Sequence, residues 1–217
     1  QKNINDAIKN YLKRDPSFEV KEIKTITGKE EGLFAWLSVN HAMGYLNESS
    51  KTIGAIDMGG ASTQISFELS DQEIKEMLSH EPTKFKKEDI AQIQINGKEK
   101  FIFSKSFLGL GINQARLAMD EEHGSFSCYP KDYELLNGQK GNFSFQTCEH
   151  LYDNVIAKYN VHFSLPNSIH LQNFVAFAEV YKNFSVIQDT SEQREISSEP
   201  EIIAHNIERV CTKSWSE

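Results

Sequence analysis

Hydrophobic and polar positions follow their clearest pattern between positions 52 and 69 of the 217-residue chain. Thr52 to Met58 is an apolar run typical of a buried strand, and Ser62 to Leu69 alternates between apolar and polar residues as a second strand would. Gly59-Gly60 stands between the two runs and favours a tight turn. The pattern therefore predicts a β-hairpin centred on these two glycines.

A helical pattern precedes this hairpin. Thr27 and Glu30 have the spacing of a capping box, which predicts a helix that begins directly after Thr27. Apolar residues then recur at helical spacing, at Leu33, Trp36, Leu37, Val39, Ala42, Met43 and Leu46. Glu31 would lie in the first turn of this helix, next to unsatisfied backbone N–H groups and the positive end of the helix dipole.

The rest of the chain predicts further helices and strands. We expect an amphipathic helix at 4–12, a polar and loosely helical segment at 71–87, a helix opening at Gly111, and helices at 149–158 and 202–215. A hairpin is expected at 93–103 with a type I′ turn at Asn96-Gly97, and a strand or helix at 174–181. The remaining segments are an extended stretch at 18–25, a loop at 121–148 and a charged loop at 190–200. Strands around a hairpin followed by alternating helices indicate an α/β fold with a mixed sheet, in a single domain over residues 1–217.

Composition limits the possible functions. A hydrophobic content of 39% is enough for a proper core. The net charge of −8 argues against a nucleic-acid-binding surface, which would need Lys and Arg to neutralise phosphates. No apolar run has the length of a membrane span, and the first residues lack a signal-peptide pattern. Histidines and cysteines are not spaced as in zinc sites.

The predicted hairpin carries candidate phosphate chemistry. Gly59 and Gly60 lack Cβ atoms, so their backbone N–H groups can approach an anion closely. Asp57, at the end of the first strand, could hold a divalent cation or its water shell. Ser62 and Gln64 are two residues apart and point to the same face. The alternative is an ordinary Gly-Gly hairpin in which Asp57 caps the turn.

Glu31 is the candidate general base. A carboxylate at a helix start, facing a phosphate site, could accept a proton from water near neutral pH. The alternative is a carboxylate that only complements the helix dipole.

Both motifs together resemble the apyrase family, the nucleoside triphosphate diphosphohydrolases. The family carries Glu-Glu-Gly-x-x-x-Trp, which is similar to the segment from Glu30 to Trp36, followed by Asp-x-Gly-Gly-Ala-Ser-x-Gln, which is similar to the segment from Asp57 to Gln64. Weaker similarities lie at Ser106 to Gly111 and at Phe174 to Ala178. The resemblance covers the chain from about Phe18 to Trp215.

The chain also departs from the family pattern. The family's Asp-Ala-Gly-Ser phosphate loop and its Ala-Gly-Met-Arg segment do not occur in these residues. Because those motifs precede the Glu-Glu-Gly helix in the family, the chain resembles the second lobe of a two-lobed enzyme, without the first lobe. Lys105 stands where the family usually has His, and Glu179 to Lys182 replaces a stretch often rich in aromatic residues.

The resemblance implies a fold, an activity and a site. The fold would be a ribonuclease-H-like lobe of the actin-like superfamily. The activity would be hydrolysis of nucleoside tri- or diphosphates by direct attack of water, with Mg²⁺ or Ca²⁺, in a secreted, cell-surface or luminal protein. The site residues would be Glu31, Ser62 and Gln64 for catalysis, the backbone of Gly59, Gly60 and Ala61 for phosphate, Asp57 for the cation through water, and Tyr181 and Lys182 for the nucleobase.

Cysteine pairing is a further expectation from the resemblance. Cys128 and Cys148 flank a polar loop that resembles a disulfide-closed loop of apyrases. The alternative is two free thiols, which a cytosolic protein would favour. Cys211 would be free or joined to a cysteine beyond Glu217.

Three other functions remain open from the sequence. An exopolyphosphatase of the same superfamily shares a Glu-Glu helix and a Gly-Gly phosphate hairpin, although Trp36 and the residues from Ala61 to Gln64 favour an apyrase. A non-catalytic, actin-like nucleotide-binding module would make Glu31 incidental. A purely structural domain would use the hairpin only as a turn.

Overall fold

The computed structural model describes residues 2–17, 19–47, 51–79, 82–159, 164–187 and 199–216. Its helices are α1 (Lys2–Leu12), α2 (Gly28–Ala42), α3 (Asp71–Leu78), α4 (Ile112–Asp120), α5 (Phe145–Lys158), α6 (Glu179–Ile187) and α7 (Pro200–Cys211). Its strands are β1 (Gly54–Met58), β2 (Ser62–Glu68), β3 (Ile90–Ile95), β4 (Lys98–Leu108) and β5 (Phe174–Ala178).

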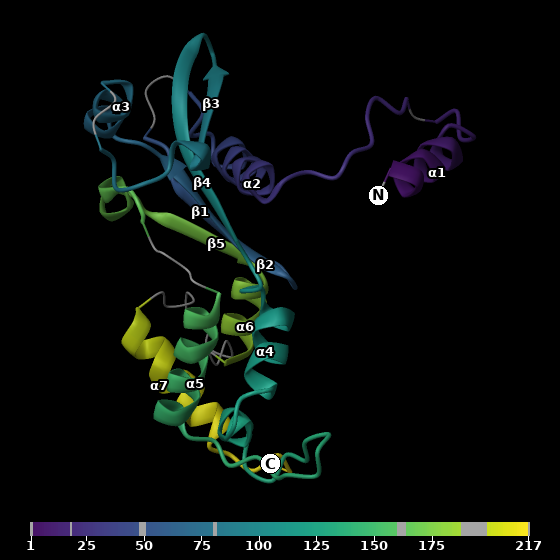
Figure 1. Cartoon of the computed structure of the whole chain (residues 1–217), viewed down its shortest axis with the longest axis vertical. Helices are drawn as coiled ribbons and strands as arrows, with labels where there is room; N and C mark the ends of the chain where they lie inside the picture. The colour runs from purple at the N-terminus through teal and green to yellow at the C-terminus, as the bar shows by residue number, and fades with distance from the viewer. Residues whose placement is uncertain are drawn as a thin grey trace.

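The five strands form one mixed sheet in the order β3-β4-β2-β1-β5. Neighbouring strands are antiparallel except β1 and β5, which are parallel. Figure 1 shows the β3–β4 hairpin at one end of the molecule and helices α4 to α7 gathered at the other end. The mixed α/β class expected from the sequence is confirmed.

The β1–β2 hairpin and the start of α2 form as the sequence predicts. In β1 and β2, Asp57 is the cross-strand partner of Gln64, and Met58 is the partner of Thr63. Thr27 caps α2, because its Oγ1 accepts the Glu30 N–H at 3.2 Å while Glu30 Oε2 accepts the Thr27 N–H at 2.8 Å. The reciprocal bonds satisfy two of the orphan N–H groups at the helix start.

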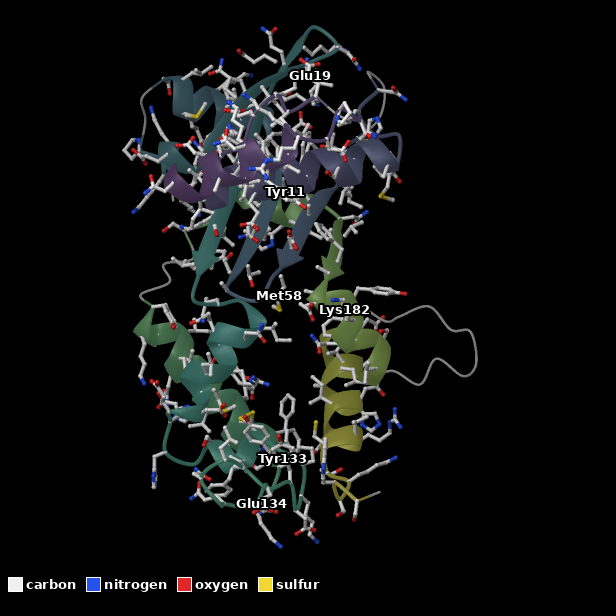
Figure 2. All side chains as sticks on the ribbon, turned by 90° about the vertical axis from the view of Figure 1, so that its right-hand side faces the viewer. Tyr11, Glu19, Met58, Tyr133, Glu134 and Lys182 are labelled. Atoms are coloured by element: carbon white, nitrogen blue, oxygen red, sulfur yellow. A yellow bond between two sulfur atoms is a disulfide. The ribbon has the colours of Figure 1, made fainter. Side chains whose placement is uncertain are left out.

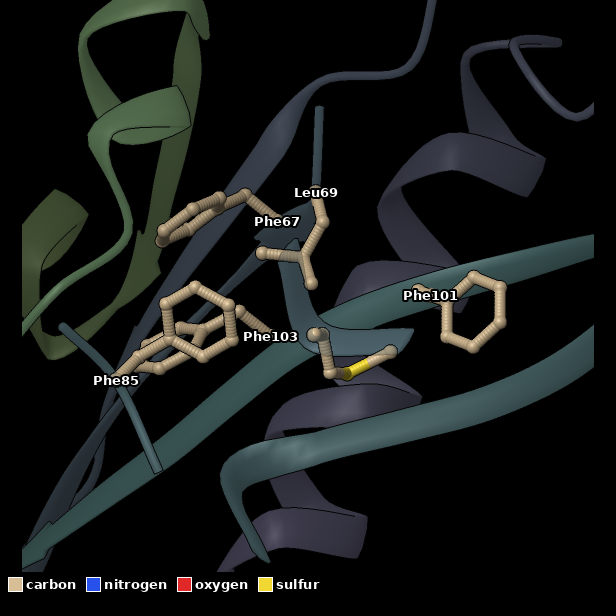
Figure 3. Packing of buried hydrophobic residues seen from close by; sticks show 6 residues of the cluster. Phe67, Leu69, Phe85, Phe101 and Phe103 are labelled. Carbon is tan, nitrogen blue, oxygen red and sulfur yellow. The ribbon is translucent and has the colours of Figure 1, made fainter. Parts of the chain in front are cut away.

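The two faces of the sheet differ in chemistry. One face carries the aromatic core, in which Phe67 and Phe103 pack with their ring centroids 5.1 Å apart (Figure 3). The core is completed by Leu69, Met77, Phe85 and Phe101. Side chains alternate along a strand, so the opposite face of β2 and β4 carries Gln64, Ser66, Ser104 and Ser106.

Helix α2 lies against this polar face, and its glycines make the contact close. A Cβ placed on Gly32 would lie 2.6 Å from both Ser66 Oγ and Ser104 Oγ. A Cβ on Gly28 would overlap the side chain of Ser106. One turn further along, Trp36 is fully buried beside Ala55 and Ile102. Small residues on both surfaces therefore bring the helix start directly onto the sheet.

Several predicted elements differ from the structure in their boundaries. Helix α5 begins at Phe145 rather than Glu149, because Ser144 caps it with a bond to the Thr147 N–H, so Cys148 lies in the first turn. The segment at 174–181, expected to be a strand or a helix, contains both, because β5 ends at Ala178 and α6 begins at Glu179. The charged loop expected at 190–200 falls largely outside the described residues.

The other predictions hold with small shifts, and the last helix, expected at 202–215, is α7, which ends at Cys211. The turn at Asn96 and Gly97 has φ values of 50° and 78°, as a type I′ turn requires. Helix α1 is present and lies apart from the sheet in Figure 1. The stretch expected to be extended, at 18–25, connects α1 to α2 and has no regular secondary structure where it is described. Among the described helices, none combines the length and apolar character needed to cross a membrane.

Cys128 and Cys148 form a disulfide, with their Cα atoms 4.9 Å apart. Cys128 packs against a small apolar cluster of Met119, Leu151 and Val155. Cys211 is free among the described residues and half-buried.

The close packing at Gly32 can be tested with Gly32→Val. The added side chain would break the Ser66–Ser104 hydrogen bond (3.0 Å) and push α2 off the sheet, which should cost about 1–3 kcal/mol. In the full-length protein we expect the thermal midpoint to fall by about 2–4 °C per kcal/mol. Ser38→Val places the same residue on the exposed face of α2 and serves as control. Equal midpoints for the two variants would contradict the packing argument.

The disulfide can be tested by replacing Cys128 and Cys148 together with alanine. The bridge closes a loop with a sequence separation of 20 residues, so its loss should cost about 3 kcal/mol through the entropy of the unfolded chain. Thermal unfolding of the full-length protein would show a lower midpoint for this variant than for Cys211→Ala, which removes a free thiol. A midpoint as high as that of Cys211→Ala would show that the bridge adds no stability.

Candidate catalytic cleft

Gln64 joins the helix and the hairpin at the candidate site. Its Nε2 donates to Glu31 Oε2 at 2.8 Å, to Ser62 Oγ at 2.8 Å and to Ser106 Oγ at 3.0 Å. Gln64 itself is only 1% exposed. The structure thus brings together the three residues predicted as catalytic, from α2 and β2, although they are up to 33 positions apart in sequence.

The contact with Glu31 fixes the orientation of the Gln64 amide. A carboxylate accepts hydrogen bonds but cannot donate them, so the NH₂ group of Gln64 must face Glu31. The NH₂ group has two protons and faces three oxygens, so the two serine hydroxyls share one N–H as acceptors when the other N–H bonds Glu31. Each serine hydroxyl keeps its own proton for another partner. The O–H groups of Ser62 and Ser106 are therefore available as hydrogen-bond donors to a molecule bound next to them.

Ser106 was not predicted as a site residue, although its segment was noted for its resemblance. It reaches the site because Gln64 and Ser106 are cross-strand partners in β2 and β4. Cross-strand partners project from the same face of a sheet at short range. Gln64 and Ser106 are 42 positions apart, and the register that pairs them cannot be read from the local pattern, so no sequence signal pointed to this contact.

These groups open into a cleft of about 450 Å³. Glu31, Ser62 and Ser106 line it together with Ile26, Gly28, Lys29, Asp89, Ser104 and Leu108. Asp89 is paired with Lys105 at 3.5 Å, so Lys105, which departs from the family pattern, binds a carboxylate at the edge of the site. Lys29 places a second cationic residue at the cleft.

Asp57 projects from the same face of the sheet as Gln64, its cross-strand partner. It is half-buried, and desolvation by burial raises the pKa of its carboxyl above the usual value of 3.8. No hydrogen-bond donor faces the carboxylate among the described residues. One free carboxylate fits a cation that keeps most of its waters and takes its other ligands from a substrate phosphate, as Mg²⁺ commonly does.

The turn at Gly59, Gly60 and Ala61 presents backbone donors at the end of the hairpin. Within the part of the chain that the structure describes, the N–H groups of Gly60 and Ala61 have no hydrogen-bond acceptor. Ala61 is exposed, so an anion can reach these groups from solvent. The geometry is suited to a phosphoryl group, as the two glycines suggest.

Tyr181 and Lys182 lie on the first turns of α6, which follows the carboxyl end of β5. The hairpin turn follows the carboxyl end of β1, the parallel neighbour of β5, so both segments leave the sheet at the same end. Met58 pairs with Ala178 at the ends of β1 and β5, and Figure 2 shows Met58 and Lys182 near each other in the middle of the molecule. The side chain of Tyr181 is 59% exposed, and Lys182 pairs with Glu179 at 2.8 Å. The fold thus brings both residues toward the site without a contact to it.

A second cavity lies far from this cleft. It has a volume of about 350 Å³ and is lined by Arg116, Asp120, Ser125, Tyr129, Tyr133, Leu135, Leu136 and Asn137. Figure 2 shows Tyr133 and Glu134 at the end of the molecule opposite the β3–β4 hairpin. Over the described ranges, His, Cys, Asp and Glu form no group of three or more that could hold a metal ion.

Comparison with known proteins gives a family match over the whole chain. The model of the GDA1/CD39 (nucleoside phosphatase) family matches residues 1–217. Ectonucleoside triphosphate diphosphohydrolase 3 of Homo sapiens is 31% identical over 150 residues, which are 60% of this chain and 26% of that protein. Golgi apyrase of Schizosaccharomyces pombe is 35% identical over 144 residues, 59% of this chain and 24% of that protein.

Two further matches cover more of the chain. Ectonucleoside triphosphate diphosphohydrolase 5 of Gallus gallus is 28% identical over 180 residues, 73% of this chain and 40% of that protein. A crystal structure of nucleoside triphosphate hydrolases from Neospora caninum aligns over 82% of this chain and 40% of that chain, with 17% identity and a TM-score of 0.40. The chain therefore spans between about a quarter and two fifths of these relatives.

The burial of Asp57 predicts a pH-dependent change in stability for Asp57→Asn. The pKa of Asp57 is higher in the folded protein than its usual value of 3.8 in the unfolded chain. The stability that the neutral carboxyl contributes to the fold is therefore fully present below pH 3.8 and is lost as pH rises through the folded-state pKa. Removing the charge should therefore raise the thermal midpoint near pH 7. This increase in the midpoint should vanish below pH 3.8, where the carboxyl is neutral in both the folded and the unfolded protein.

The measurement is thermal unfolding of the full-length protein in the presence of a chelator, at pH 7 and below pH 3.8. Asp6→Asn makes the same change at an exposed position on α1 and should leave the midpoint unchanged at pH 7. A lower midpoint for Asp57→Asn at pH 7 would show that the carboxylate is stabilised by a contact in the fold.

Proposed function

Because the chain belongs to the GDA1/CD39 (nucleoside phosphatase) family, we propose that its full-length protein hydrolyses nucleoside tri- or diphosphates to the monophosphate and phosphate. The observation that carries the proposal is the hydrogen-bonded unit of Glu31, Gln64 and Ser62 at the cleft. An ordinary hairpin turn would have no need of a buried amide that links a helix-start carboxylate to a serine hydroxyl. The relatives named as diphosphohydrolases and apyrases support the same reaction class.

The proposed reaction is in-line attack of water on the terminal phosphorus. Glu31 accepts a proton from the water while the new O–P bond forms and the bond from phosphorus to the leaving nucleotide oxygen breaks. Glu31 has one oxygen, Oε2, bound to Gln64, which holds the carboxylate in place. The other oxygen is left to take the proton. Phosphoryl transfer needs little covalent chemistry from the protein, so this positioning is its main task.

Ser62 and Gln64 orient the attacking water in this proposal. The Ser62 hydroxyl accepts from Gln64, so its own proton is directed to the water or to a phosphoryl oxygen. Ser106 acts on the same amide from the neighbouring strand and limits its rotation. Within the turn expected to bind phosphate through Gly59, Gly60 and Ala61, the N–H groups of Gly60 and Ala61 would hold the phosphoryl oxygens. The Gly59 N–H does not take part, because it donates to Ser62 O at 2.9 Å across the turn.

Asp57 would hold Mg²⁺ or Ca²⁺ through water, and the cation would supply neutralisation of the phosphate charge. Burial raises the pKa of Asp57, and no charged group of the described residues offsets that burial. A carboxylate in this position suits the role because a cation would supply the missing positive charge. Tyr181 and Lys182 would contact the nucleobase, for which their position at the same sheet edge is the support.

The first lobe of the same protein is the proposed partner. The chain spans at most 40% of the relatives compared above, and the Asp-Ala-Gly-Ser and Ala-Gly-Met-Arg motifs of the family are missing from it. A net charge of −8 also leaves most of the neutralisation of a triphosphate to other groups, and it disfavours nucleic acid as a partner. We therefore propose that these residues alone are inactive.

An extracytoplasmic location is part of the proposal. The Cys128–Cys148 disulfide persists in oxidising compartments, and it argues against two reduced thiols in the cytosol. Relatives named as ectonucleotidases and Golgi apyrases support a secreted, cell-surface or luminal protein.

Glu31→Gln in the full-length protein tests the proposed function. Glutamine keeps the size and the hydrogen-bonding capacity of the side chain but cannot accept the proton, so phosphate release from nucleotides should fall by about 10²–10⁴-fold. Glu30→Gln is the matched control, because a capping box accepts Glu or Gln at this position. Glu30 bonds Thr27 rather than Gln64, so its replacement should leave the rate nearly unchanged.

Two results would contradict the proposal. Equal rates for Glu31→Gln and the unaltered protein would favour a nucleotide-binding module in which Glu31 is incidental. Release of phosphate from polyphosphate with nucleotides left intact would favour an exopolyphosphatase.

A further inference from the structure

The segment from Gly109 to Gln114 binds every backbone carbonyl of the Gly59-Gly60-Ala61 turn. Ile112 N–H donates to Gly59 O at 3.0 Å. Asn113 N–H and Gln114 N–H donate to Gly60 O at 2.9 Å and 3.1 Å, and Gly109 N–H donates to Ala61 O at 2.9 Å. Three of these donors are the first N–H groups of α4, which have no partner within the helix itself.

This arrangement fixes the direction of the turn's own donors. No described peptide bond is cis, and in a planar trans peptide the C=O and the following N–H point in opposite directions. Holding Gly59 O and Gly60 O toward α4 therefore turns the N–H groups of Gly60 and Ala61 away from α4. These are the two N–H groups that have no acceptor among the described residues.

The contact between the two segments leaves no room for a side chain at Gly111. A Cβ at this position would lie 2.5 Å from the backbone N and C of Ala61, and backbone atoms cannot rotate away as a side chain can. Gly109 has φ of +92°, a conformation that residues with a Cβ rarely adopt. Thr63 Oγ1 closes the contact from the strand, since it donates to Leu110 O at 2.7 Å.

Polarisation adds to this geometric effect. Each peptide unit of the turn accepts a hydrogen bond from the positive end of α4 or its preceding turn, which makes its N–H a stronger donor. An anion bound to the N–H groups of Gly60 and Ala61 would continue this chain of hydrogen-bonded dipoles from α4 through the turn. A free hairpin of the same sequence would have neither the fixed direction nor the added donor strength.

We propose that residues Gly109 to Gln114 act as a positioning clamp, which aims the N–H groups of Gly60 and Ala61 at the terminal phosphate and strengthens them as donors. The proposal rests on the phosphate site of the proposed function and extends it to a segment that does not touch substrate. Thr63 belongs to the clamp as a positioning residue, because its hydroxyl ties the segment to β2.

Thr63→Val in the full-length protein tests the clamp. The change removes the bond to Leu110 O and keeps the branched shape of the side chain, so the clamp loosens without a large change in volume. We expect the KM for nucleotide and the Kd for inorganic phosphate to rise together by about tenfold, the equivalent of one lost hydrogen bond of about 1.4 kcal/mol. Phosphate binding is measured by calorimetry with Mg²⁺ present, and KM by phosphate release.

Four further variants separate positioning from stability. Thr63→Ser restores the hydroxyl and should return both constants to within about twofold of the unaltered protein. Thr52→Val removes a hydroxyl bond of the same length, 2.7 Å to Glu68, at the other end of the sheet, and should leave both constants unchanged. Gly111→Ala should weaken phosphate binding more than Gly141→Ala, which creates a comparable backbone conflict in the disulfide-closed loop.

The outcomes distinguish the clamp from the proposed function. If Thr63→Val binds phosphate as tightly as the unaltered protein, or if Thr63→Ser fails to restore binding, the clamp is wrong even when hydrolysis is normal. If the unaltered protein releases no phosphate from nucleotides but binds phosphate in a Thr63-dependent way, the clamp stands and the hydrolytic function is wrong. Absence of phosphate binding by the unaltered protein overturns the clamp.

Discussion

The close approach of α2 to the sheet is the constraint on which the site depends. Gly28 and Gly32 lie one turn apart on the face of the helix that meets Ser66, Ser104 and Ser106. This contact has little apolar surface, so it contributes less hydrophobic stabilisation than an aliphatic interface would. Its effect is geometric, because it lets the carboxylate of Glu31 reach a side chain that belongs to the middle of the sheet.

The two faces of the sheet differ in how they combine apolar packing with polar groups. The aromatic cluster around Phe67 and Phe103 lies on the face opposite α2. The α2 side has an apolar cluster of its own around Trp36, but next to Gly28 and Gly32 the sheet presents polar side chains. The polar face holds Gln64, Ser66 and Ser104, which are buried but hydrogen-bonded. Ser66 donates to Ser104, Ser104 donates to a backbone carbonyl of α2, and Gln64 donates to side chains at the cleft. Such groups are tolerable in an interior only when their hydrogen bonds are made, which also makes the arrangement rigid.

The local elements of this fold could be predicted from the sequence, whereas the contacts between them could not. The capping box at Thr27, the hairpin and the Asn96-Gly97 turn each depend on a few neighbouring residues, so their patterns were sufficient. Glu31, Ser62 and Gln64 were singled out from the helix start and the strand pattern and given catalytic roles by the resemblance, and the structure shows them in contact. Ser106 and the segment from Gly109 to Gln114 enter the site through the register of β4, which depends on long-range pairing that no local pattern encodes.

The arrangement also explains why one lobe would supply only part of a phosphohydrolase site. In the proposed function, the groups on this chain would be a general base, donors held by hydrogen bonds and one carboxylate for a cation, all of which would position neutral water and a phosphoryl group. Cationic side chains are few at the cleft, where Lys29 is present and Lys105 is paired with Asp89. A triphosphate brings several negative charges, and neutralising them in a cleft that already holds Glu31 and Asp89 needs positive charge from elsewhere. A second lobe facing this one would meet that need, and separating the two would keep the base away from nucleotide until both surfaces close on the same phosphate.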